Sequence, residues 1–568
     1  MRVVSAFFTV VLLSQLAVSA QDAGRLGQYA DRWFYVGQQI RTEEDLQTVQ
    51  ETVATAAEHG LNGMLWSGAL ESVGRWPADR LALLAKLKTF CAERKVTIIP
   101  ILWSIGYGTQ QWRHPHLAAG LPCTDVPFAV AGNAATLVPD ASLALENGGF
   151  EVFKGDKMQG YTFHDKPGTV SFADTVVRHG GLASLRMEAV GANEHGHARV
   201  MQKVAVRPHR HYRFTCWVRT AELESVSAFK IQIYGPKGAL VPVTTPIRST
   251  MEWQKLTVHF NSGSHSEVRI YVGLWKGRSG TLWLDDFSVK ECGPVNVLRR
   301  PGTPISVRND DGTITYEEGR DFLPIKDDRF NSRRPREDDV PITLAPGSRI
   351  QDGQRLRVSW YHPLFVMRSQ VSTCMSEPAL YDYFRESAAA LATHLGSGKW
   401  FLSMDEIRAG GSCAACKARG LTMAQILGEC VSQQRAIIRG VDPDADIYIW
   451  SDMFDPNHNA HGDYYLVDGD FTDAWKALPK DIVVSCWRHS TRDKSMRFFA
   501  ENGFKTQAAA YYDTDTLDTC RDWLKTANET PNCTGIMYTT WRKKYGLLAD
   551  FGDLIRAQSR PLTEGGQR

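Results

Sequence analysis

The sequence predicts a (β/α)8 barrel that is interrupted after its third strand by an antiparallel β-sandwich. In residues 21–144 and again in residues 355–568, apolar runs of strand length alternate with amphipathic helical stretches, which is the pattern of a parallel sheet. Residues 145–292 contain only short alternating strands, the pattern of a β-sandwich. Three barrel strands precede the interruption and five follow it, and eight strands close this type of barrel.

The size and composition of the chain indicate a folded protein of two or three domains. It has 568 residues, of which 43% are apolar and 23% are charged. Its formal net charge of +2 carries no signature of a nucleic-acid partner. Beyond the first 20 residues no segment is apolar for long enough to span a bilayer, so we expect no membrane partner.

Residues 1–20 have the features of a secretory signal peptide. Arg2 precedes an apolar stretch at residues 6–13, and small residues follow up to Ala20, where cleavage is expected. Two polar residues interrupt the apolar run too early for a membrane anchor. The mature protein is therefore expected to be secreted or periplasmic.

Eleven cysteines in an exported chain favour disulfides, and the odd count leaves at least one thiol unpaired. Two pairs are plausible on spacing alone, Cys216 with Cys292 and Cys520 with Cys533. Cys413-Ala-Ala-Cys416 could ligate zinc or act in redox exchange, but no second Cys or His pair stands nearby at finger spacing. The pattern favours a local disulfide or structural thiols, so we predict no metal and no cofactor in the active site.

Residues 21–144 form the first part of the predicted barrel. Apolar residues recur at helical spacing between residues 46 and 56, and Gly60 is placed to end that helix. The expected elements are strands at residues 33–38, 61–66 and 96–103, and helices at residues 42–59 and 78–94.

Residues 145–292 form the predicted sandwich. Its main strands are expected at residues 198–206, 212–219, 229–234, 254–260, 268–274 and 281–290. It opens with an Asn-Gly-Gly-Phe-Glu turn at residues 147–151 and closes on a Leu-Asp-Asp strand at residues 283–289. These ends resemble those of jelly-roll carbohydrate-binding modules. The resemblance implies the fold and allows a structural calcium, and it leaves open whether this copy binds glycan or has a purely architectural role.

The second part of the barrel follows a connector at residues 293–354, which is rich in Pro, Gly, Asp and Arg. An accessory strand at residues 355–360 is expected to carry His362 into the site. A helix is expected at residues 377–395. The remaining barrel strands are predicted at residues 399–406, 446–450, 481–487, 504–512 and 534–541.

The predicted site is centred on the strand at residues 399–406, whose apolar run ends in two adjacent carboxylates, Asp405 and Glu406. The carboxyl ends of barrel strands carry the active site in this fold. A surface acid pair that begins a helix is the alternative. Other strand ends supply aromatic and acidic side chains: Trp103, Trp450, Asp452, Trp487, Tyr511, Tyr512, Asp513 and Trp541. Sugar rings stack on aromatic faces, and carboxylates serve an oxocarbenium-like transition state, so we expect a glycan substrate.

The adjacency of Asp405 and Glu406 suggests a division of labour. If the strand extends through both residues, they point to opposite sides and cannot readily flank one glycosidic bond as equivalent groups. If Glu406 protonates the leaving oxygen while Asp405 orients a 2-acetamido group, the acetamido oxygen becomes the nucleophile. This is retaining hydrolysis with assistance from the substrate.

Four of the strand ends form a recognisable set: Asp405-Glu406, Trp450-Ser-Asp452, Tyr511-Tyr512-Asp513 and Trp541. In the barrel they resemble the corresponding motifs of the β-N-acetylhexosaminidases of glycoside hydrolase family 20. The resemblance implies Glu406 as acid/base, Asp405 as acetamide orienter, Tyr511 or Tyr512 as donor to the acetamide oxygen, and Trp450, Trp487 and Trp541 as pocket walls. It implies an exo-acting enzyme whose glycan substrate ends in an N-acetylhexosamine.

Two other functions stay open at this point. One is a glycosidase that uses Glu406 as acid and Asp452 as nucleophile or base, on sugars without an acetamido group. The other is a non-catalytic glycan-binding protein. In the enzymes, like charge and an enclosed pocket are expected to raise the pKa of Glu406 relative to that of Asp405. The sequence carries no signal of oligomeric state.

Overall fold

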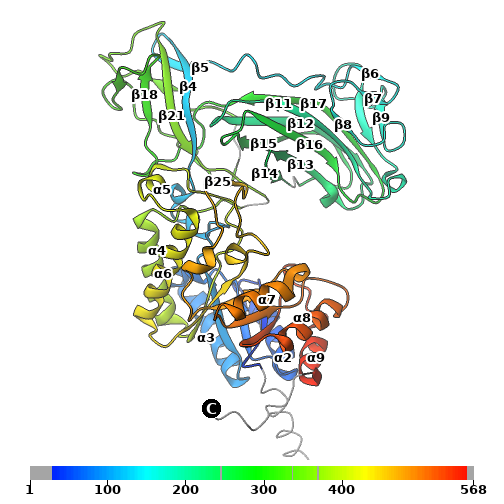
Figure 1. Cartoon of the computed structure of the whole chain (residues 1–568), viewed down its shortest axis with the longest axis vertical. Helices are drawn as coiled ribbons and strands as arrows, with labels where there is room; N and C mark the ends of the chain where they lie inside the picture. The colour runs from blue at the N-terminus through cyan, green and yellow to red at the C-terminus, as the bar shows by residue number, and fades with distance from the viewer. Residues whose placement is uncertain (1–28, 244–245, 335–336, 368–369, 559–568) are drawn as a thin grey trace, which may run out of the picture.

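The protein consists of a barrel, a β-sandwich and a smaller six-stranded sheet (Figure 1). The computed structural model describes residues 29–243, 246–334, 337–367 and 370–558. The expected signal peptide, residues 1–20, lies outside the described residues. In Figure 1 the barrel and its helices occupy the lower half, and the other two assemblies lie above them. Within the described ranges no helix is both long and apolar enough to cross a membrane.

The barrel is closed and built from eight parallel strands, as predicted. Strand β1 pairs with β2 on one side and with β28 on the other, which closes the sheet. The order of the strands around the barrel is their order in the chain: β1 (Asp31–Val36), β2 (Gly63–Trp66), β3 (Thr97–Leu102), β22 (Lys399–Leu402), β24 (Asp446–Trp450), β26 (Val483–Cys486), β27 (Thr506–Ala509) and β28 (Cys533–Tyr538). The chain leaves the barrel after β3 and returns to it at β22.

Helices cover the outside of the barrel (Figure 1). They are α2 (Glu43–Glu58), α3 (Ala78–Glu93), α4 (Pro378–His394), α5 (Ala414–Ala418), α6 (Met423–Val441), α7 (Arg492–Glu501), α8 (Asp518–Glu529) and α9 (Leu548–Gln558). Thr42 caps α2 through a reciprocal bond pattern with Asp45, which fixes where that helix begins. The connection from β24 to β26 differs from the predicted alternation, because it contains short 3-10 turns and β25 (Leu466–Val467) in place of an α-helix.

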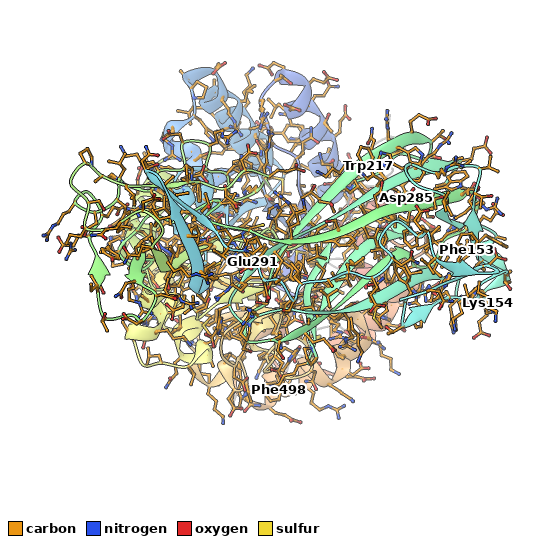
Figure 2. All side chains as sticks on the ribbon, turned by 90° about the horizontal axis from the view of Figure 1, so that it is seen from above. Phe153, Lys154, Trp217, Asp285, Glu291 and Phe498 are labelled. Atoms are coloured by element: carbon orange, nitrogen blue, oxygen red, sulfur yellow. The ribbon has the colours of Figure 1, made fainter. Side chains whose placement is uncertain are left out.

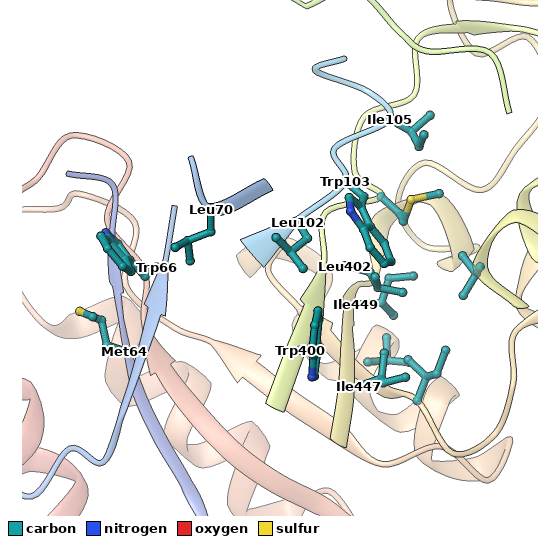
Figure 3. Packing of buried hydrophobic residues seen from close by; sticks show 14 of the residues in the cluster. Met64, Trp66, Leu70, Leu102, Trp103, Ile105, Trp400, Leu402, Ile447 and Ile449 are labelled. Carbon is teal, nitrogen blue, oxygen red and sulfur yellow. The ribbon is translucent and has the colours of Figure 1, made fainter. Parts of the chain in front are cut away.

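Side chains fill the interior of the barrel, so it is a packed core. At the amino-terminal ends of the strands, Lys399 donates to Asp31 at 2.9 Å and the Tyr448 hydroxyl donates to the same carboxylate at 2.7 Å. A second apolar layer lies between the strands and the helices, where Figure 3 shows Trp400 beside Ile447. The two layers hold the opposite, carboxyl ends of the strands in place.

Residues 153–291 contain two five-stranded antiparallel sheets, and their facing side chains form one core. One sheet has the order β15-β12-β17-β10-β9, with bounds Met251–Asn261, His211–Ala221, Thr281–Glu291, Ser184–Met187 and Ser171–Asp174. The other has the order β14-β13-β16-β11-β8, with bounds Ala239–Val243, Phe229–Tyr234, Glu267–Leu274, Ala198–Ala205 and Phe163–His164. The alternation of buried and exposed residues along β12 shows why its period of two was readable from sequence.

A six-stranded sheet adjoins the sandwich. Its order is β19-β18-β21-β4-β5-β20, with bounds Thr315–Tyr316, Ser306–Asn309, Arg355–His362, Leu121–Ala131, Ala134–Leu137 and Ile342–Thr343. Residues 293–354, expected as a connector, therefore contribute three of its strands, and residues 121–137, expected within the barrel, contribute two. Four of its strands have only two to four residues, which is too short to show a periodic pattern, whereas the eleven-residue β4 does alternate and was missed.

All eleven cysteines are free thiols in the structure. The disulfides that we expected, Cys216 with Cys292 and Cys520 with Cys533, are not formed. Cys216 is part of the apolar core of the sandwich, whereas Cys292 lies beyond the end of β17 beside His211. Proximity in sequence within one module did not bring these sulfur atoms together.

The sandwich shares its hydrophobic core with loops of the barrel. Leu364, Val366, Ala409 and Leu466, which are not part of the sandwich, pack into the same buried cluster. The first two lie on the segment that returns to the barrel, and the other two lie on the loops after β22 and β24. The sandwich is therefore docked against the carboxyl end of the barrel through an apolar contact.

A buried ion pair marks where the sandwich meets the six-stranded sheet. Arg210 and Glu291 lie 3.2 Å apart, and Arg210 also donates to the backbone oxygen of Asp125 in β4. Figure 2 labels Glu291 near the centre of the molecule, with Phe153 and Lys154 at the far end of the sandwich. The junction is thus both polar and enclosed.

Removal of the sandwich tests this shared core. We expect deletion of residues 145–292 to lower the melting temperature of the barrel, because Leu364, Val366 and Leu466 become exposed, at a cost of roughly 3–5 kcal/mol. Calorimetry of the deleted and intact chains measures the shift. Adding Leu364→Gln and Leu466→Gln to the deleted chain should recover solubility, and an unchanged melting temperature on deletion would show that the sandwich is independent.

Candidate active site

The predicted acid pair lies at the carboxyl end of β22, where the chain makes a sharp turn. Glu406 has a φ of 52°, in the left-handed region that few residues other than glycine adopt. The turn packs against Gly106, where an added Cβ would lie 2.0 Å from the backbone oxygen of Asp405. The loop after β3 must therefore carry glycine at this position for the acid pair to be held as it is.

Glu406 is held as an anion by three donors. Arg408 contacts both carboxylate oxygens, with Nη1 at 2.9 Å from Oε2 and Nη2 at 2.8 Å from Oε1. The Tyr107 hydroxyl and the Gln370 amide donate to Oε2 at 2.8 and 2.6 Å. Burial pushes the pKa of Glu406 upward, but the hydrogen bonds and charge of Arg408 outweigh it, so the pKa lies below its usual value.

Asp405 has the opposite electrostatic surroundings. Burial and, second, the negative charge of Glu406 raise the pKa of Asp405 to about 6, although the Ser403 hydroxyl donates to its carboxylate at 2.8 Å. Asp405 and Glu406 are both partly exposed. The two neighbouring carboxyls therefore differ in protonation over a range of pH, and both can reach a substrate.

The order of these two pKa values contradicts the prediction from sequence, which had the pKa of Glu406 raised relative to that of Asp405. The prediction considered only like charge and enclosure. It missed Arg408, whose guanidinium reaches back two residues to hold the Glu406 carboxylate.

Asp452 lies behind the acid pair and is completely buried. Its Oδ2 accepts from the backbone N–H of Glu406 at 2.9 Å and from Asn459 at 2.8 Å. Trp487 Nε1 lies 3.4 Å from its Oδ1. Burial and the charge of Asp405 raise the pKa of Asp452 to about 8. Because it has no exposed surface, Asp452 positions Glu406, and its predicted role as nucleophile or base is corrected.

Aromatic rings surround the acid pair on one side. Tyr512 is 50% exposed and lies parallel to Trp487, with ring centroids 6.4 Å apart. Trp541 is 41% exposed and packs edge-on against the buried Trp450, with centroids 5.8 Å apart. On the other side Tyr107 is 38% exposed. Trp450 is thus the floor of this region, and the three exposed rings are available to a ligand.

Asp513 is partly exposed and supports the aromatic side of the site. Its carboxylate accepts from the Trp541 backbone N–H at 2.9 Å and from the Thr540 hydroxyl at 2.5 Å. These bonds fix the loop after β28 against the end of β27. Asp513 thus positions Trp541, and its contact with a substrate stays a prediction.

Two other predicted site residues, Trp103 and Tyr511, point away from the site. Trp103 is buried in the layer between barrel and helices, where Nε1 donates to Ser387 at 2.8 Å (Figure 3). Tyr511 is buried and donates its hydroxyl to the backbone oxygen of Thr514 at 2.7 Å. Their strands end close to the site, but these side chains point outward, because alternate residues on a strand face opposite sides.

His362 is also displaced from the predicted site. It is fully buried at the end of β21, its ring stacks on that of His211 at 3.9 Å, and its Nε2 lies 3.0 Å from Asn261. It therefore belongs to the junction between the six-stranded sheet and the sandwich. The prediction failed because β21 is part of that sheet and does not point into the barrel.

Sequence reasoning missed most of the groups that hold Glu406. Tyr107 and Gln370 stand at the two ends of the long interruption, 263 positions apart. Asn459 follows β24 on an irregular loop. Only Arg408 left a usable signal, since it follows the acid pair by two residues in Asp405-Glu406-Ile-Arg408.

Two groups of side chains among the described residues could hold a metal ion. One consists of Cys374, Cys413 and Cys416, and the other of His211, His259 and Cys292. Both are buried and neither includes the acid pair.

The structural calcium that the resemblance allows in the sandwich is not tested by the structure. Asp285 Oδ2 accepts from the backbone N–H groups of His179 and Gly180, and Glu151 accepts from that of Leu182. The carboxylates of Asp285 and Glu151 thus hold the loop at residues 179–182 directly by hydrogen bonds.

No protein-family model matches the chain, and no curated protein matches it. Among solved structures, a rhamnosidase from Novosphingobium sp. PP1Y is similar over 94% of this chain and 60% of its own, at 9% identity and a TM-score of 0.33. An arabinose-bound α-L-arabinofuranosidase covers 70% of this chain and 71% of its own, at 10% identity and a TM-score of 0.22. A CBM4 structure covers 26% of this chain and 99% of its own, at 16% identity and a TM-score of 0.21. The neighbours thus include glycoside hydrolases and carbohydrate-binding modules. Their TM-scores are too low to assign a function, so the function has to be argued from the chemistry of the site.

The two carboxyls should have opposite effects on stability. The raised pKa of Asp405 makes the folded chain bind a proton that the unfolded chain has lost, so Asp405 costs stability once the pH rises above about 4, and roughly 2–3 kcal/mol above about pH 6. Asp405→Asn should therefore increase the free energy of unfolding at about pH 7 and change it little at about pH 4.

Glu406→Gln is the matched control for that experiment. The lowered pKa of Glu406 contributes stability above its unfolded pKa, which is lost as the pH falls through its folded value, so this variant should be destabilised at about pH 7. Denaturant unfolding at several pH values compares the two. A destabilising effect of Asp405→Asn at about pH 7 would contradict the assigned order of pKa values.

Proposed function

We propose that this chain is a glycoside hydrolase whose reaction takes place at the carboxyl end of the barrel. The observation that carries the proposal is a pair of adjacent, partly exposed carboxyls in different surroundings. Arg408, Tyr107 and Gln370 bind Glu406 and lower its pKa, whereas burial raises the pKa of Asp405 to about 6. Between those values Asp405 holds a proton and Glu406 is charged, the combination that glycoside hydrolysis uses. The proposal exchanges the two roles that the sequence resemblance implies. Both carboxyls can serve one bond because they lie on a turn beyond β22, which ends at Leu402, and the left-handed backbone at Glu406 replaces the strand alternation expected from sequence.

In the proposed reaction Asp405 gives its proton to the glycosidic oxygen as the bond from that oxygen to the anomeric carbon breaks. Glu406 faces the positive charge that develops on the sugar, and among the described residues its Oε1 is contacted by Arg408 alone. Water then adds to the anomeric carbon. Its proton returns to Asp405 if Glu406 acted as nucleophile, or passes to Glu406 if Glu406 acted as base.

The aromatic residues provide the binding surface for the sugar. Tyr107, Tyr512 and Trp541 are exposed large rings at the same end of the barrel as the acid pair. The apolar faces of a sugar stack on such rings, while its hydroxyls bind charged and amide groups such as Arg408 and Gln370. A glycan substrate is thus supported by the composition of the site as well as by its acids.

A preference for a terminal 2-acetamido sugar, as in β-N-acetylhexosaminidases, is the second candidate. It needs a hydroxyl that donates to the acetamide oxygen. Tyr511 is committed to Thr514, so the half-exposed Tyr512 is the remaining candidate donor. The acetamide oxygen would then attack the anomeric carbon, and the charged Glu406 would accept from the acetamide N–H.

A panel of aryl glycosides with and without a 2-acetamido group tests the proposal. We expect Asp405→Asn to lower kcat by about 10²–10⁴ for poor leaving groups, which need the proton, and much less for nitrophenolate leaving groups. Glu406→Gln should lower kcat for both kinds. Tyr511→Phe, outside the aromatic region, is the matched control and should leave kcat nearly unchanged.

Two outcomes would overturn the assignment. If the loss of kcat depends on the leaving group in Glu406→Gln and not in Asp405→Asn, then Glu406 is the acid. Glycan binding without turnover of any glycoside would make the chain a non-catalytic glycan-binding protein. Equal rates on sugars with and without the acetamido group would remove the second candidate alone.

We further propose that residues 1–20 direct export and are cleaved, so that the enzyme acts outside the cytoplasm. The amino-terminal sequence of the protein recovered from the medium or periplasm measures this directly.

A further inference from the structure

Three thiols from two separate segments meet beside the barrel. Cys413 and Cys416 lie at the start of α5, and Cys374 lies just before α4. The sulfur of Cys374 is 3.6 Å from that of Cys413 and 3.7 Å from that of Cys416, and the latter two are 3.6 Å apart. The third thiol that the Cys-Ala-Ala-Cys motif lacked in sequence is therefore supplied by the segment returning from the interruption.

The near-equal distances fit the edges of one metal tetrahedron. Zinc–sulfur bonds are about 2.3 Å long, so two thiolates at tetrahedral angles lie about 3.8 Å apart. A disulfide requires a sulfur separation of about 2.05 Å. Thiolates on different irons of an iron–sulfur cluster would be spread more widely than a single ion requires. The triangle thus has the dimensions of three ligands on one ion.

Buried charged groups adjoin the thiols. Arg300 is 5% exposed, forms an ion pair with Glu377 at 3.1 Å and directs Nη2 to the sulfur of Cys413 at 3.7 Å. Its Nη1 has no hydrogen-bond partner among the described residues. Three thiolates on a divalent cation carry one net negative charge, which a guanidinium at this distance stabilises.

We propose that Cys374, Cys413 and Cys416 supply three ligands to one zinc ion. The ion would join the segment that ends the interruption to the loop that follows β22. Gln370 precedes Cys374 by four residues and Arg408 precedes Cys413 by five, and both hold Glu406. The zinc site is thus a structural clamp whose position supports the acid pair without contacting a substrate.

The metal content of the full-length chain tests this proposal. Protein purified under reducing conditions should contain zinc, and Cys374→Ser and Cys416→Ser should each lose one equivalent. Cys91→Ser is the matched control, because Cys91 is also buried but lies outside both groups of ligands, and it should keep the wild-type content.

Cobalt spectroscopy of the wild-type chain decides the question even where a variant fails to fold. Replacement of zinc by Co²⁺ should give the sulfur-to-metal charge-transfer band and intense visible bands of a tetrahedral thiolate site. A zinc content in the Cys374→Ser/Cys416→Ser double variant equal to that of the wild-type chain would overturn the proposal. So would a reduced wild-type chain that binds Co²⁺ without the charge-transfer band, or a Cys413–Cys416 disulfide found by alkylation and mass spectrometry, which would indicate a redox pair.

Discussion

The left-handed turn at Glu406, packed against Gly106, is the constraint on which the site depends. It sends two neighbouring carboxyls into different surroundings. The Glu406 carboxylate binds the guanidinium of Arg408, while the Asp405 carboxyl is shielded from solvent and lies beside the negative charge of Glu406. Asp452 secures the turn from behind through the Glu406 backbone N–H. The turn thus places the two carboxyls in the surroundings that separate their pKa values.

The long interruption of the barrel takes part in this arrangement. Tyr107 at its beginning and Gln370 at its end both donate to one oxygen of Glu406, so the barrel and the inserted segment hold the same carboxylate. The sandwich core extends to Leu466, on the loop after β24. The placement of the sandwich and the electrostatics of the acid pair are therefore connected through a few packed loops.

The barrel could be predicted from the sequence because each strand is an apolar run of sufficient length. The acid pair could be predicted because both acids follow such a run. The six-stranded sheet could not be predicted in full, because its strands at residues 315–316 and 342–343 are too short to show an alternation of apolar and polar residues. The partners of Glu406 were hidden for a different reason. A pKa depends on groups that are close in space, and Gln370 reaches Glu406 only through the fold.

The protonation of Asp405 is the central claim and can be measured directly. Carbon-13 NMR of the full chain labelled at Asp and Glu side-chain carboxyls should show an Asp resonance that titrates near pH 6, as the pKa of Asp405 requires, and that is absent from Asp405→Asn. The resonance of Glu406 should stay that of a charged carboxylate over the same range. A Glu resonance with the raised midpoint, lost in Glu406→Gln, would contradict the assignment and return the acid role to Glu406.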